Sequence, residues 1–131
     1  MSHIELAIMF KSVLEQDRAA IVLCDLEHTI VYMNPAAVNN YARYGGGNLV
    51  GHSLLNCHNS ESCNIIKKVL LWFKENHDNN MIYTSHNEKQ NKDVYMVALR
   101  DSNGELIGYY EKHEYRNIET ADFYDFSKSL I

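Results

Sequence analysis

Hydrophobic residues recur at helical spacing over residues 1–18, and they form two apolar strips along one predicted helix. The larger strip consists of Leu6, Met9, Phe10, Val13 and Leu14. The smaller strip lies beside it and consists of Ile4, Ala7 and Ile8. An amphipathic surface helix normally buries only one apolar strip, so the smaller strip needs a partner of its own.

Two segments rich in β-branched residues follow at 19–25 and 28–34, and their separation by Leu26 and Glu27 predicts a tight hairpin. Pro35 then suits the first turn of a helix, with Asn34 as its cap, and the glycines at 45–47 end that helix. A longer amphipathic helix is predicted over residues 61–76, capped by Asn59 or by Ser60.

Three further strands are predicted at 81–87, 92–100 and 105–115, the last two joined by a turn at 101–104. Strands, then helices, then strands indicate an α+β domain with helices on one face of a single sheet. Tyr95, Val97 and Leu99 form an outward row that is also apolar, so we expect the leading helix to lie across the other face. The predicted organisation is a dimerisation helix at 1–18, one domain at 19–116, and a tail at 117–131 that includes a short helix.

Composition narrows the class of protein. Hydrophobic residues make up 46% and charged residues 22%, which is typical of a globular domain. The net charge is −5 and no lysine or arginine cluster exists, which argues against nucleic acid and against an anionic membrane surface as partners. No apolar run approaches the roughly 20 residues that span a bilayer, so we expect a cytoplasmic protein. Three cysteines in such a protein predict no structural disulfide.

The segment LLNCHNSESCN at 54–64 holds the most obvious candidate chemistry. Zinc would need about four ligands, but Cys57 and His58 are adjacent and diverge on most backbones, so we predict no metal site. For the same reason we predict no catalytic thiol and no enzyme, since the base must face the nucleophile. A redox-sensing thiol remains an alternative, because oxidation requires only exposure and a lowered pKa.

Four motifs in the right order resemble the PAS sensor domain family from about Ile21 to Tyr115. An aspartate, Asp25, ends the first strand, and Asn-Pro-Ala-Ala at 34–37 starts a helix. The other two motifs are Leu-x-Gly-x-Ser-Leu at 49–54 and Arg-Asp-x-x-Gly-x-x-x-Gly at 100–108. The resemblance implies a five-stranded antiparallel sheet, a cavity beneath its helices, and a non-enzymatic sensory role.

The resemblance also implies candidate pocket residues. By analogy with flavin-binding relatives, Val94, Met96 and Ala98 face the cavity. The remaining candidates come from other strands and from the turn before the long helix, and they are Cys24, Tyr32, Tyr110 and His58. The flavin-adduct motif is absent, so no photoreceptor is expected. The expected ligand is a small apolar or aromatic molecule; haem held by a histidine is one alternative, and simple core packing of Cys24, Tyr32 and Tyr110 is another.

These inferences favour a sensory module that binds a small ligand or a protein partner and transmits the change through its terminal helices. Because the sensor fold uses nearly all residues, we expect output through a downstream protein in trans. The second hypothesis is a metal-binding, haem-binding or redox-sensing protein that uses Cys57 and His58. Pairing of Ile4, Ala7 and Ile8 across a twofold axis predicts a homodimer. The alternative cover for this strip is the C-terminal segment, through Phe123, Phe126 and Leu130.

Overall fold

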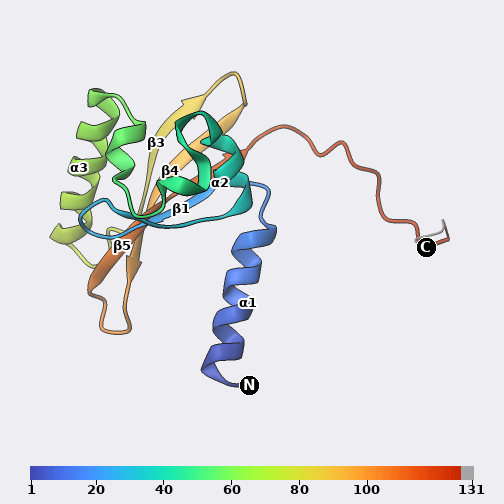
Figure 1. Ribbon diagram of the computed structural model, residues 1–131, viewed down its shortest axis with the longest axis horizontal. Helices are drawn as coiled ribbons and strands as arrows, with labels where there is room; N and C mark the ends of the chain where they lie inside the picture. Colours follow the sequence, from blue (N-terminus) through green and yellow to red (C-terminus); the bar gives the residue numbers. More distant parts are fainter. Residues whose placement is uncertain (128–131) are drawn as a thin grey trace.

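The computed structural model describes residues 1–127 of the 131-residue chain (Figure 1). Its helices are α1 (His3–Gln16), α2 (Pro35–Asn40) and α3 (Ser60–Glu75). Its strands are β1 (Ile21–Cys24), β2 (Ile30–Met33), β3 (Met81–Asn87), β4 (Lys92–Arg100) and β5 (Leu106–Tyr115). Three short 3₁₀ turns connect α2 to α3, at Ala42–Tyr44, Gly46–Leu49 and Leu54–Cys57.

The five strands form one antiparallel sheet in the order β2-β1-β5-β4-β3. Helices α2 and α3 and the turns between them cover one face of this sheet (Figure 1). The core lies between these two layers, where Ile66 and Phe73 of α3 pack with Met96 and Tyr109 of the sheet. The predicted α+β fold, with helices on one face of a five-stranded antiparallel sheet, is therefore confirmed.

Two asparagines begin the helices, as predicted. The Asn59 side chain accepts a hydrogen bond from the Ser62 N–H at 2.8 Å and caps α3. Asn34 is fully buried, and its Oδ1 accepts from the N–H groups of Ala37 and Ile21, both at 2.9 Å. Its Nδ2 donates to the carbonyls of Leu14 and Ala19, also at 2.9 Å. Asn34 therefore joins the end of α1, the start of β1 and the start of α2.

Two further residues fix close contacts of the sheet: Gly108 between β5 and β1, and Arg100 between β4 and the end of α3. A Cβ on Gly108 of β5 would lie 2.4 Å from the Cys24 carbonyl oxygen, so only glycine lets β5 approach β1 this closely. The Arg100 guanidinium of β4 donates to the Phe73 carbonyl at 2.7 Å and to the Asn76 carbonyl at 3.2 Å. Arg100 therefore satisfies carbonyls at the end of α3, which otherwise lack partners within the helix.

The expected position of α1 across the outer face of the sheet is wrong. The helix projects away from the domain (Figure 1), and none of its residues is buried. Val13, on the larger strip, is 68% exposed. The outer face has a polar network of its own, in which Arg116 donates to the hydroxyl of Tyr95 and to Asp93. Because of this network, the outer face has less need of a helix packed over it than an apolar row would have. The hydrogen bonds of Asn34 instead hold the end of α1 beside α2.

Residues 117–127 contain no helix, so the short helix expected in the tail is not formed there. Residues 128–131, including Leu130, lie outside the described residues. Phe123 is 98% exposed and Phe126 is also exposed, so neither covers the apolar strips of α1. No helix in residues 1–127 is long and apolar enough to cross a membrane.

Candidate ligand pocket

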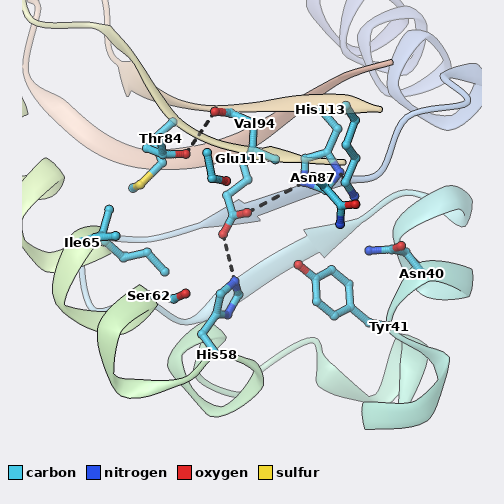
Figure 2. Close-up of a pocket in the computed structure, with 14 residues that line it drawn as sticks. Asn40, Tyr41, His58, Ser62, Ile65, Thr84, Asn87, Val94, Glu111 and His113 are labelled. Carbon is cyan, nitrogen blue, oxygen red and sulfur yellow. Dashed lines mark hydrogen bonds and ion pairs between the residues drawn. The ribbon is translucent and has the colours of Figure 1, made fainter. Parts of the chain in front are cut away.

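A cavity of about 240 Å³ opens between the inner face of the sheet and α3 (Figure 2). This volume corresponds to roughly eight water molecules at about 30 Å³ each, enough for a small metabolite. The lining residues come from six parts of the fold: Asn40 and Tyr41 at the end of α2, His58 before α3, Ser62, Ile65 and Ile66 on α3, Thr84, Ser85 and Asn87 on β3, Lys92, Val94 and Met96 on β4, and Glu111 and His113 on β5.

A β-bulge shapes the β3 side of the cavity. Tyr83 pairs with Tyr95 and Ser85 pairs with Val94, so Thr84 is an extra residue on β3. The Thr84 hydroxyl donates to the Val94 carbonyl at 3.0 Å. The extra residue changes the phase of the strand, and polar side chains of β3 thereby line the cavity.

Glu111 lies at the centre of the polar side of the cavity, between His58 and His113 (Figure 2). Its Oε1 is 3.3 Å from His58 Nε2, and its Oε2 is 3.8 Å from His113 Nε2. The Glu111 side chain is only 13% exposed. Burial alone would raise the pKa of Glu111, but the two imidazole rings outweigh burial and lower this pKa from 4.5 to about 2. Glu111 is therefore a buried carboxylate anion.

His58 faces hydrogen-bond acceptors with both ring nitrogens. Its Nδ1 is 3.0 Å from the Leu54 carbonyl, and its Nε2 faces the Glu111 carboxylate. Only the doubly protonated ring can donate to both groups, so the geometry selects the imidazolium. Consistent with this, the hydrogen bond to Glu111 raises the pKa of His58 even though burial opposes the charge. His58 and Glu111 form a buried ion pair.

Lys92 adds a second cation to the cavity. The residue is 5% exposed, and its Nζ is 3.3 Å from His113 Nδ1. Burial lowers the pKa of Lys92, and the nearby Glu111 carboxylate opposes this effect. An ammonium group has only donors, so His113 Nδ1 accepts and the ring carries its proton on Nε2, toward Glu111. The chain Lys92, His113, Glu111, His58 is thus a connected polar cluster.

The residues expected in the pocket take three positions. Val94, Met96 and His58 line the cavity. Cys24 also points inward, but it is 2% exposed and packs within the core, and Ala98 packs against that core. Core packing, the alternative weighed for Cys24 from the sequence, is therefore what the structure has.

Tyr32 and Tyr110 are on the outer face, so their placement in the cavity is wrong. Both pair with Leu23, whose neighbours in β1 point inward. The inward tyrosine of β5 is Tyr109, which is fully buried. Burial and the nearby Glu15 carboxylate of α1 raise the pKa of Tyr32 to about 12, in keeping with a position beside α1 rather than in the pocket. The cause is an irregularity in the pairing of β1 with β2, together with a one-residue difference of phase in β5.

The cysteines are free in the structure. Burial and the Glu111 carboxylate raise the pKa of Cys57, and burial raises the pKa of Cys24 to about 12. Both shifts favour the unreactive thiol over the thiolate. Within residues 1–127, no three histidine, cysteine or acidic side chains are arranged to hold a metal ion.

Lys92, Glu111 and His113 line the cavity but were not predicted as pocket residues from the sequence. The signal that was available is the two-residue alternation of β5, in which Tyr109, Glu111 and His113 share one face. Once Tyr109 is placed inward, the other two follow.

The fold is that of PAS domains. The structure matches a PAS domain from Colwellia psychrerythraea with a TM-score of 0.64 and 14% identity, over 85% of this chain and 97% of that chain. It matches the PAS domain of BvgS from Bordetella pertussis with a TM-score of 0.62 and 13% identity, over 87% and 88% of the two chains. A sensory box sensor histidine kinase structure from Vibrio cholerae gives a TM-score of 0.58 and 13% identity, over 88% and 95%. No family model matches the sequence, and no curated protein does.

Proposed function

We propose that this protein is a sensory module that binds a small molecule in the cavity beneath α3 and signals to a separate protein. The observation that carries the proposal is the buried polar cluster around an open cavity. A domain that needed only a filled core would place apolar side chains there, because burying charged groups costs free energy unless they are paired. The PAS fold, which includes structures described as sensory, supports the same conclusion.

Strand pairing and two hydrogen bonds connect the cavity to α1. Glu111 of β5 pairs with Val22 of β1, and the neighbouring Ile21 N–H donates to Asn34. Asn34 in turn donates to the Leu14 carbonyl at the end of α1. A change in the cavity that shifts β5 against β1 would therefore reach the position of α1. This is the route by which we propose that the signal leaves the domain.

The partner of α1 that we propose is a second copy of this chain. Ile4 is 75% exposed and Ile8 is 63% exposed, and neither the sheet nor residues 117–127 covers them. Burying one isoleucine side chain is worth about 1.5–3 kcal/mol. In a dimer with a twofold axis, each of these residues is buried in both copies of the chain. A symmetric pair of α1 helices closes the assembly. It also links the two domains, so that ligand binding in either cavity acts on the same helix pair.

Ligand binding is tested by native mass spectrometry of protein purified from its own host. Wild-type protein should carry a bound small molecule. Met96→Trp puts an indole into the cavity and should abolish the added mass. Val97→Trp makes the same change on the opposite face of β4 and should keep it. Circular dichroism checks that both variants fold. An unliganded wild-type protein, or a ligand that survives Met96→Trp, would contradict the proposed pocket.

The dimer is tested separately by light scattering at micromolar concentration. Changing Ile4 and Ile8 together to Glu should halve the mass of the wild-type particle while leaving the circular dichroism spectrum unchanged. The control changes Ser12 and Gln16 to Glu, which adds two charges at the same spacing outside the smaller strip. This control should remain a dimer. A wild-type protein that scatters as a monomer would show that the proposed dimer is wrong.

A further inference from the structure

Lys92 is a buried lysine whose ammonium group forms no ion pair in the described part of the chain. The residue is 5% exposed and lines the cavity, and its Nζ makes one hydrogen bond, to His113 Nδ1. The Tyr115 ring centroid is 5.7 Å from Nζ, and the Glu111 carboxylate is near enough to oppose the effect of burial on the pKa of Lys92. Within residues 1–127 no carboxylate forms an ion pair with Lys92. Lysine is almost never fully buried unless it is paired, so this ammonium has unused donors at the cavity wall.

The charges around the cavity sum to one positive charge. Glu111 contributes one negative charge, and the His58 imidazolium balances it within an ion pair. Lys92 is then left as the uncompensated cation. Any ligand that fills the cavity removes water from this ammonium, so a neutral ligand would leave the charge less well solvated than before.

Along β4 the cavity lining changes from polar at Lys92 to apolar at Val94 and Met96, and Met96 lies opposite Glu111 of β5. Asn87 pairs directly with Lys92 across β3 and β4. Its side-chain amide lies on the same side of the cavity as Lys92 (Figure 2). Ile66 and Met96, both buried in the core, form the apolar end together with Val94. A complementary ligand has a negative group at one end and a compact apolar body at the other.

We propose that the pocket takes a small monocarboxylate whose carboxylate accepts hydrogen bonds from Lys92 and whose apolar body packs against Ile66, Val94 and Met96. This inference rests on the proposed function, because it names the ligand class of the same cavity. It refines the apolar or aromatic ligand expected from the sequence by adding an anionic group. A dianion is disfavoured, since one free cation faces it and Glu111 repels a second negative charge.

The position of Lys92 also gives binding a consequence inside the protein. A carboxylate at Lys92 draws the ammonium away from His113 Nδ1, which is its present partner at 3.3 Å. His113 contacts Glu111, and Glu111 holds His58. His58 directly precedes Asn59, the cap of α3. The cluster therefore connects the carboxylate site to the start of the helix that covers the cavity.

The experiment uses two pairs of matched probes, benzoate with benzamide and butyrate with butyramide. Each pair has the same size and shape and differs in charge. Binding to the full chain is followed by chemical shifts of backbone amides at the cavity, for wild type and for Lys92→Met, which keeps the unbranched side chain and removes the ammonium. A control, Lys68→Met, removes an exposed lysine of α3.

We expect both acids to bind more tightly than their amides, and Lys92→Met to weaken the acids by about tenfold or more, as for loss of one charge-assisted hydrogen bond. Lys68→Met should leave the affinities unchanged. Amides that bind as tightly as acids, or acids that bind Lys92→Met normally, would overturn the carboxylate site and leave the pocket itself intact. If none of the four probes perturbs the cavity, both the carboxylate site and the proposed ligand pocket are contradicted.

Discussion

The strongest stability prediction concerns Glu111→Gln, which keeps the shape of the side chain and removes its charge. In the wild type, the carboxylate pairs with the His58 imidazolium at 3.3 Å, and the two side chains are 13% and 16% exposed. The substitution leaves His58 with no opposite charge in a site that water hardly reaches. We therefore expect a large loss of stability at pH 7 and a fall in the pKa of His58.

The magnitude follows from the burial of the pair. Removing one partner of a buried ion pair typically costs 3–5 kcal/mol, because the other charge is left uncompensated. The small residual exposure and the remaining amide oxygen of glutamine place the expected loss at the lower end, about 3 kcal/mol. For a chain of this length, such a loss lowers the melting temperature by roughly 10 °C.

The assay is urea unfolding followed by circular dichroism, with Glu114→Gln as the matched control. Glu114 lies on the same strand and makes ion pairs with Lys112 at 2.6 Å and Arg116 at 2.7 Å, both shorter than the pair of Glu111. Its side chain is 28% exposed and faces outward. Exposed pairs contribute about 0–1 kcal/mol, so the control should lose less than about 1 kcal/mol.

The pH dependence provides an internal check. The pKa of Glu111 is depressed in the folded state, so its contribution is present above the ordinary value of 4.5 and is lost as pH falls toward about 2. The difference between wild type and Glu111→Gln should therefore shrink with acidification over this range. Equal losses for Glu111→Gln and Glu114→Gln at pH 7 would refute the buried cluster as described.

Three further predictions concern single residues. Gly108→Ala should cost about 3 kcal/mol in urea unfolding, because its Cβ meets the Cys24 carbonyl, whereas Gly47→Ala, which has space, should change stability little. Arg100→Lys should cost about 2 kcal/mol by the same assay, because lysine cannot reproduce the guanidinium contacts with several carbonyls. The pKa of His58 is raised, so its stabilising contribution is full below 6.5 and lost at higher pH, and His58→Gln should destabilise more at pH 5.5 than at pH 9.

Each of these predictions has a clear contrary result. Equal stability of Gly108→Ala and Gly47→Ala would mean that β5 does not approach β1 as described. A neutral Arg100→Lys would mean that the guanidinium contacts do not hold the end of α3. A loss for His58→Gln that grows with pH would mean that His58 is neutral in the folded protein.

Local signals explain which parts of the fold could be predicted from the sequence. Asn34 and Asn59 begin helices because a short polar side chain can accept a hydrogen bond from the first turn, and this requires no knowledge of distant residues. The turn at 101–104 could be predicted equally well, because the sequence places a glycine there. In the structure Gly104 has a φ of +80°, a conformation that favours glycine. Elements with a local cause were therefore placed correctly.

The pocket depended on features that the sequence does not display. The bulge at Thr84 sets the phase of β3 and arises from pairing with β4. In β5, Ile107, Tyr109 and Tyr110 are all apolar or aromatic, so alternation gave no phase, and a shift of one residue moved Tyr110 to the wrong face. The orientation of α1 depends on hydrogen bonds from Asn34 to carbonyls before β1, which are tertiary contacts.

The most direct test of the ligand pocket is a crystal structure of the protein purified from its own host without added ligand. We expect density for a small molecule between Lys92 and Met96, with a carboxylate at the ammonium group and with Glu111 still paired to His58. A cavity closed by side chains, or density for a molecule that leaves Lys92 without an anionic partner, would contradict this expectation.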